Sequence, residues 1–141
     1  MVRYYSEDTK FVFKARQFNN LWLRMVAESE MKRIGALNYI FCSDHYILDI
    51  NQKYLQHDYF TDVITFDYCE GNLLSGDVFI SVDTVRENAL TYGAASFEEE
   101  LYRVMVHGLL HLIGYDDHTP EQQKLMRSKE NVYLDLRLRL A

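Results

Sequence analysis

The sequence contains few of the residues that crosslink a chain or interrupt it. It has two cysteines, one proline, and no apolar run longer than the four residues 39–42. Two cysteines cannot build a disulfide framework, and four apolar residues fall far short of the roughly 20 that cross a bilayer. The first ten residues also lack the apolar core of a secretory signal. We therefore expect a cytoplasmic protein without a membrane segment.

The chain also lacks the features that separate domains. It contains no internal repeat, no low-complexity tract, and no linker rich in proline, glycine or serine. Its 141 residues are 48% hydrophobic, which is enough for one core, and the chain is too short for two ordinary domains. We therefore expect a single domain over residues 1–141.

Basic residues are scarce in the middle of the chain. Residues 44–121 hold three lysine or arginine residues against fifteen acidic ones, whereas residues 1–43 hold seven against four and residues 122–141 five against two. An acidic middle suits a cation site and repels a phosphate backbone, so a nucleic-acid substrate would meet the basic ends. The simpler interpretation is that these charges only form solvated faces.

Strand and helix patterns alternate along the sequence. Strands are expected over residues 2–5, 36–42, 63–66 and 76–82. Helices are expected over residues 14–32, 44–54, about ten residues ending at Gly93, 97–113, and from Pro120 onward. Ser43 and Ser96 are placed to cap two of these helices, and Gly35 is expected to end the first. This order predicts an α+β fold with a roughly four-stranded mixed sheet and about five helices.

Three of the five histidines fall within twelve positions, at His107, His111 and His118. His107 and His111 are four residues apart on a predicted helix, so both rings project from one face, as in helical zinc motifs. Gly114 then ends the helix, and the chain turns back to present His118. The spacing predicts one zinc ion bound by these three imidazoles. The simpler alternative makes His107 and His111 core histidines and His118 an unrelated loop residue.

Three imidazoles leave one coordination position open, which is typical of catalytic rather than structural zinc. A water in that position would have its pKa lowered towards about 7, so the predicted catalytic group is this water and no side chain is assigned. Asp116 and Asp117 are candidates to accept the N–H of a ligand ring. Zinc peptidases carry a glutamate after the first histidine, in H-E-x-x-H, and Gly108 at that position disfavours a peptidase.

The segment 107–118 reads HGLLHLIGYDDH and resembles the motif H-G-x-L-H-L-x-G-Y-D-H of the YbeY family. Residues 61–66, TDVITF, are similar to that family's T-D-V-L-S-F, and residues 76–81, GDVFIS, to its G-D-I-x-I-S strand. The resemblance implies a zincin-like metal helix and a metal-dependent single-strand endoribonuclease. It further implies action in the cytoplasm on ribosomal RNA, in small-subunit maturation and ribosome quality control, with ribosome or small-subunit components as partners.

The chain departs from the family pattern at two points. The third family histidine stands ten residues after the first, where this chain has Asp117. We expect His118 to be the third ligand through one inserted residue, with Asp117 as the alternative. The family also carries an arginine after the tyrosine of N-x-x-Y-R, where this chain has Leu55. Lys53 and His57 are the candidates to replace that guanidinium beside the metal.

The leading hypothesis is a zinc-dependent hydrolase of RNA phosphodiesters. One alternative is a non-catalytic ribosome-assembly factor in which the metal orders the last two helices, and Leu55 favours it. Another is a metal hydrolase of small molecules, although the acidic middle of the chain disfavours anionic ones. The charge of the groove that leads to the metal separates these hypotheses, because a basic groove supports RNA and an acidic one opposes it.

Overall fold

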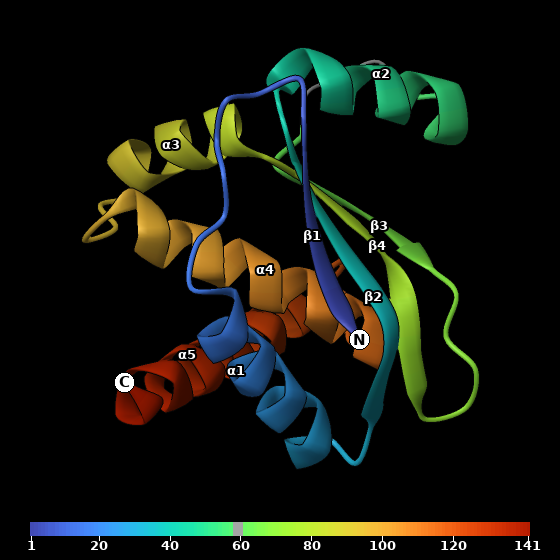
Figure 1. The fold of residues 1–141 in the computed structure, drawn as a ribbon, viewed down its shortest axis with the longest axis vertical. Helices are drawn as coiled ribbons and strands as arrows, with labels where there is room; N and C mark the ends of the chain where they lie inside the picture. Colours follow the sequence, from blue (N-terminus) through green and yellow to red (C-terminus); the bar gives the residue numbers. More distant parts are fainter. Residues whose placement is uncertain (58–60) are drawn as a thin grey trace.

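One four-stranded sheet runs through the computed structural model, which describes residues 1–57 and 61–141 (Figure 1). Its strands are β1 (Val2–Glu7), β2 (Arg33–Cys42), β3 (Val63–Asp67) and β4 (Leu73–Ser81), in the spatial order β1-β2-β4-β3. β1, β2 and β4 are parallel, whereas β3 pairs antiparallel with β4. The sheet is therefore mixed and four-stranded, as the sequence predicts, and β1 and β3 form its edges.

Five helices cover this sheet unequally. They are α1 (Arg16–Ser29), α2 (Asp44–Leu55), α3 (Val82–Thr91), α4 (Phe97–Ile113) and α5 (Pro120–Leu140). α4 lies on one face of the sheet with α1 and α5 beside it, and α2 packs at one end of the opposite face (Figure 1). None of the helices in the described part of the chain has both the length and the apolar character needed to cross a bilayer.

The larger core lies between the sheet and helices α1, α4 and α5. β4 turns Val78 and Ile80 inward, where they are fully buried in that core. The Trp22 Nε1 donates a hydrogen bond to the carbonyl of Tyr133 at 2.8 Å, which joins α1 to α5. Full burial of a side chain such as Val78 or Ile80 stabilises a fold by roughly 1.5–3 kcal/mol. The position of α4 is therefore set by packing on several sides.

α4 approaches β4 closely at a glycine. A Cβ added at Gly108 would lie 2.7 Å from the Val78 Cγ1 and 3.4 Å from the Thr65 Cγ2, so a larger residue would force the helix and the sheet apart. Leu112, one turn further along this face of α4, is also buried. Positions 107 and 111 stand on the neighbouring face of the helix, which turns toward α5.

Three predicted ends, in the two helices α2 and α4, are confirmed by their caps. The Ser43 hydroxyl accepts a hydrogen bond from the Tyr46 amide at 3.1 Å, and the Ser96 hydroxyl accepts one from the Glu99 amide at 3.1 Å. Gly114 follows α4 with φ 125°, a backbone angle that favours glycine. Local chemistry therefore determines where α2 begins and where α4 begins and ends.

Several predicted boundaries differ from the structure by a few residues, and two of the differences have a clear local cause. Gly35 does not end the first helix, because Met31 takes the left-handed conformation (φ 62°) four residues earlier and Gly35 lies inside β2. Val82 does not close β4, because the Ser81 hydroxyl accepts a hydrogen bond from the Thr84 amide at 3.2 Å and so starts α3. In both places a local turn or cap competes successfully with the apolar pattern.

Candidate metal centre

His107 and His111 project from successive turns of α4 toward the same point. Their Nε2 atoms lie 3.0 Å apart, and their ring planes make an angle of 82°. The two side chains are 20% and 22% exposed, so they stand at the border between core and solvent. The structure thus brings together the two rings that the spacing of four places on one helix face.

The third group at this point is a carboxylate. The Asp117 Oδ2 lies 3.4 Å from the His107 Nε2 and 3.4 Å from the His111 Nε2. One potential ligand atom from each of the three residues lies within 4.8 Å of the others, and among the described residues this is the set that is close enough to hold one ion. We refer to His107, His111 and Asp117 as the ligand group.

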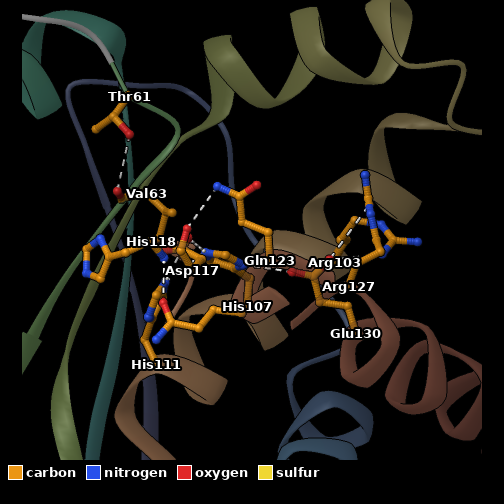
Figure 2. Close-up of polar contacts among 11 residues, drawn as sticks. Thr61, Val63, Arg103, His107, His111, Asp117, His118, Gln123, Arg127 and Glu130 are labelled. Atoms are coloured by element: carbon orange, nitrogen blue, oxygen red, sulfur yellow. Dashed lines mark hydrogen bonds and ion pairs between the residues drawn. The ribbon is translucent and has the colours of Figure 1, made fainter. Parts of the chain in front are cut away.

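His118 does not join the ligand group. Its side chain is exposed, and its ring lies apart from the other two imidazoles (Figure 2). The reason is local, because the amides of His118 and Thr119 both donate to the Gln122 Oε1, at 3.0 and 3.1 Å. The chain at position 118 therefore already belongs to the N-terminal cap of α5. In this structure Asp117 stands where the sequence predicts His118.

The donor chemistry of the ligand group suits a transition-metal ion. Imidazole nitrogens and carboxylate oxygens are ligands of catalytic zinc, and a set of three leaves a position for water or substrate. Magnesium and calcium prefer sites built from oxygen atoms alone, so two imidazoles favour zinc or a similar metal over them. The residues present therefore fit one zinc ion.

A buried glutamate of α5 orients the first imidazole. Glu130 is 5% exposed, and its Oε2 accepts a hydrogen bond from the His107 Nδ1 at 2.7 Å. With the proton on Nδ1, the Nε2 of His107 keeps the lone pair that a metal needs. The predicted acceptors for a ligand ring were Asp116 and Asp117, but the structure gives this role to Glu130. In the sequence, a glutamate in the last helix looks like any solvated residue.

Charge compensation around Glu130 affects both imidazoles. The Arg103 Nη1 lies 3.0 Å from the Glu130 Oε1. Burial opposes the charged form of Glu130, yet the hydrogen bonds and charges of His107 and Arg103 lower its pKa. Burial likewise opposes the charged form of His107, but Glu130 and nearby carboxylates raise its pKa. Burial and the charge of His107 lower the pKa of His111. The pKa of His107 is therefore shifted upward and that of His111 downward, so His107 holds its second proton more firmly.

The 114–119 segment, which carries Asp117, is tied to the end of α1. The Tyr115 hydroxyl donates to the Glu30 Oε1 at 2.5 Å, and the Lys129 Nζ lies 3.1 Å from the Glu30 Oε2. The Tyr133 hydroxyl donates to the same carboxylate. Burial opposes the charged form of Glu30, but these three donors lower its pKa. Glu30 thus joins α1, α5 and the 114–119 segment at one point.

A cavity of about 610 Å³ opens beside the ligand group, and we call it the site cavity. Its charged wall residues are Asp62, Glu99, Glu100, Asp117, Glu130, Arg103, Arg127 and the titratable His107. Burial raises the pKa of Asp62 and of Glu100, which favours their neutral forms. The wall is still mainly acidic, so the described residues do not form the basic groove that would favour RNA.

The two candidates to replace the family arginine, Lys53 and His57, are not among the described residues that line the site cavity. Lys53 is 64% exposed and pairs with Asp49 at 3.0 Å on α2. The His57 amide donates to the Asn51 carbonyl at 3.1 Å. Leu55 ends α2 and is 39% exposed. The segment 55–61 includes residues 58–60, which lie outside the described residues. Its far end borders the site cavity, because residue 61 belongs to the cavity wall.

The sequence and the fold both have counterparts among known proteins. The chain matches the family model described as Endoribonuclease YbeY over residues 3–137. It is 49% identical over 136 residues to the endoribonuclease YbeY of Bacteroides thetaiotaomicron, covering 96% of this chain and 98% of that protein. It is 53% identical over 115 residues to the endoribonuclease YbeY of Flavobacterium psychrophilum, covering 82% and 81%. The solution structure of TM1509 from Thermotoga maritima matches with a TM-score of 0.67 and 31% identity, covering 96% of this chain and 87% of that one.

Proposed function

This chain belongs to the YbeY family, and from that membership we propose that it is a zinc-dependent endoribonuclease that cleaves single-stranded RNA. One structural observation carries the proposal. The Nε2 atoms of His107 and His111 and the carboxylate of Asp117 converge beside the site cavity, in a chain whose relatives are named endoribonucleases. A metal site next to an open cavity supports hydrolysis rather than a purely structural role for the ion.

In this proposal the ligand group holds the ion, and His118 is the alternative third ligand. A bound zinc ion supplies a Lewis acid and lowers the pKa of a water to about 7. Glu130 keeps the proton of His107 on Nδ1, so that the Nε2 faces the ion. Asp117 adds a negative charge that partly balances the ion and fixes the third direction of the site.

We also propose where the protein acts and on what. The family supports ribosomal RNA maturation as the process. We extend the proposal to maturation of the small subunit, to ribosome quality control and to ribosomal components as partners. We propose the cytoplasm as the place of action, because it suits the processing of ribosomal RNA. Residues 1–141 act as one metal-binding domain, since the family model spans residues 3–137 and one sheet organises the described chain.

A second candidate function is a non-catalytic assembly factor that binds small-subunit particles. Two observations favour it, namely Leu55 at the position of the family arginine and the mainly acidic wall of the site cavity. Either would weaken the hold on a phosphate in the transition state. The assembly factor would need the ligand group only to order the 114–119 segment.

One experiment separates the two candidates. Purified protein is analysed for zinc and incubated with a short unstructured RNA, with and without a chelator, alongside the variants His111→Ala and His45→Ala. His45 is exposed on α2 and serves as the matched imidazole control. We expect wild type and His45→Ala to hold zinc and cleave, and His111→Ala to do neither. Zinc-loaded wild type that leaves the RNA intact while binding small-subunit particles would support the assembly factor instead.

A further inference from the structure

An RNA phosphate in the site cavity meets an electrostatic obstacle. The cavity wall presents five carboxyl groups, and each one that is ionised repels a phosphate at short range. The described residues of the wall include two permanent cations, Arg103 and Arg127. If the proposed function is right, these two arginines are the candidates among the described wall residues to neutralise the substrate where it approaches the ligand group.

Arg103 is already engaged within the protein. Its Nη1 lies 3.0 Å from the Glu130 Oε1, and its Nη2 donates to the Asn131 Oδ1 at 2.9 Å. Its side chain is 19% exposed, and it compensates a carboxylate that is nearly buried. Removing it from that pairing would leave Glu130 as an uncompensated buried charge. Arg103 therefore stabilises the Glu130 carboxylate that orients His107, and it is not available to bind a substrate phosphate.

Arg127 is more exposed than Arg103 and less tightly paired. Its side chain is 59% exposed, and its Nη1 lies 3.7 Å from the Glu130 Oε1, which is too long for a hydrogen bond. Figure 2 shows Arg103 and Arg127 together beside Glu130, the residue that also holds His107. The guanidinium of Arg127 therefore keeps its paired N–H donors for a ligand while it borders the same cavity as the ligand group.

We propose that Arg127 holds a phosphate of the RNA substrate in the site cavity, an inference that rests on the proposed endoribonuclease function. A guanidinium matches two phosphate oxygens with two parallel N–H groups, which a lysine cannot do. This assignment gives the chain a phosphate-binding cation although position 55 holds leucine. The cation comes from α5 and reaches the substrate from the side of Glu130.

The test measures binding rather than cleavage, so that catalysis does not interfere. A fluorescently labelled, short unstructured RNA is titrated with chelator-treated wild type, Arg127→Ala, Arg127→Lys and Arg139→Ala at several salt concentrations. Arg139 is the matched control, because it lies on the same helix, is 67% exposed, pairs with Asp135 at 3.3 Å, and is not among the residues of the cavity wall. Thermal unfolding and zinc content verify that each variant is folded and can load metal.

We expect Arg127→Ala to raise the Kd for RNA roughly tenfold, the loss typical of one charge-assisted hydrogen bond. It should also make the slope of log K against log salt shallower by about 0.7, the value for one phosphate contact on a single strand. The Kd of Arg127→Lys for RNA should lie between those of wild type and Arg127→Ala. Lysine keeps the positive charge but cannot donate two parallel N–H groups to one phosphate. Arg139→Ala should match wild type in both measurements.

Two results overturn the inference, and they are distinguishable. In the first, wild type cleaves RNA, and the Kd of Arg127→Ala for RNA equals those of wild type and Arg139→Ala. The phosphate is then held by another residue, and the proposed function stands. If zinc-loaded wild type neither binds nor cleaves RNA, the proposed function fails and this inference fails with it.

Discussion

The ligand group is held from two sides that the fold stabilises in different ways. α4 presents His107 and His111 from a helix whose other faces pack on the sheet and on its neighbouring helices. The 114–119 segment presents Asp117 from outside the core and depends on a few directed bonds, above all that from Tyr115 to Glu30. The position of α4 depends on many weak contacts, so the loss of one changes it little. The position of the 114–119 segment depends on a few hydrogen bonds, so the loss of one changes it more.

This difference predicts two kinds of response to mutation. Changes to the packing of α4 should alter the stability of the protein and leave the metal affinity nearly unchanged, because both histidines move with the helix. Changes to the bonds of the 114–119 segment should alter the metal affinity and leave stability nearly unchanged, because little apolar surface depends on them.

Removal of the metal should give the largest effect on activity, and it should show directly that α4 and the 114–119 segment are stabilised differently. We expect chelation to abolish RNA cleavage while the helical circular dichroism signal persists, because a core of this size does not depend on an ion. Amide hydrogen exchange should accelerate in the 114–119 segment and change little in α4. Loss of the helical signal on chelation would instead identify a structural site and remove the distinction between the two sides.

The next largest effect should follow from removing the third ligand. Asp117→Ala is expected to weaken zinc binding by at least about a hundredfold, because zinc sites of four ligands gain roughly 10–16 kcal/mol in total. His118→Ala is the matched control from the adjacent position, and we expect it to change the affinity little. Competition with a chromogenic chelator measures both. A larger loss of zinc affinity in His118→Ala than in Asp117→Ala would identify His118 as the third ligand.

A smaller effect should come from loosening the 114–119 segment. Tyr115→Phe removes the hydroxyl that bonds Glu30 and keeps the ring. We expect zinc affinity to fall about tenfold, because the segment that carries Asp117 loses one of the bonds that position it. Tyr68→Phe, at an exposed position, controls for the loss of a hydroxyl. The melting temperature of the chelated protein should hardly change. A large drop in stability with unaltered zinc affinity would contradict the comparison.

The smallest effect should come from the packing side. Gly108→Ala places a methyl group 2.7 Å from the Val78 Cγ1, and we expect a net loss of about 1 kcal/mol, because overpacking exceeds the gain in helix propensity. Chemical denaturation of the chelated protein measures it, and zinc affinity should stay near that of wild type. In a Val78→Ala background the same substitution should cost less, which a double-mutant cycle would reveal.

The side of the site that depends on helix periodicity could be predicted from the sequence. The spacing of His107 and His111 places them on one face, and the cap at Ser96 and the turn at Gly114 mark the ends of their helix. The other side depends on contacts between residues far apart in the chain. Glu130 lies 23 residues from its partner in α4, and Glu30 lies 85 residues from its partner in the 114–119 segment. No local pattern distinguishes such glutamates from solvated ones.

The choice between positions 117 and 118 could not be settled from the sequence for a related reason. A preference for imidazole over carboxylate as a zinc ligand favours His118. The bonds from the amides of residues 118 and 119 to Gln122 depend on where α5 begins, and they direct the side chain of His118 away from the ligand group. In this structure the backbone geometry of the helix cap thus puts the carboxylate of Asp117, and not the ring of His118, beside the two imidazoles.

The contact between Gly108 and Val78 also constrains how this scaffold can evolve. Zinc peptidases need a glutamate at the position of Gly108, but here the first carbon of any side chain already meets β4. A larger residue at position 108 would destabilise the protein while Val78 keeps its size, and a smaller residue at position 78 would by itself destabilise it too. Whichever substitution comes first is therefore unfavourable, which hinders selection one change at a time from turning this helix into that of a peptidase.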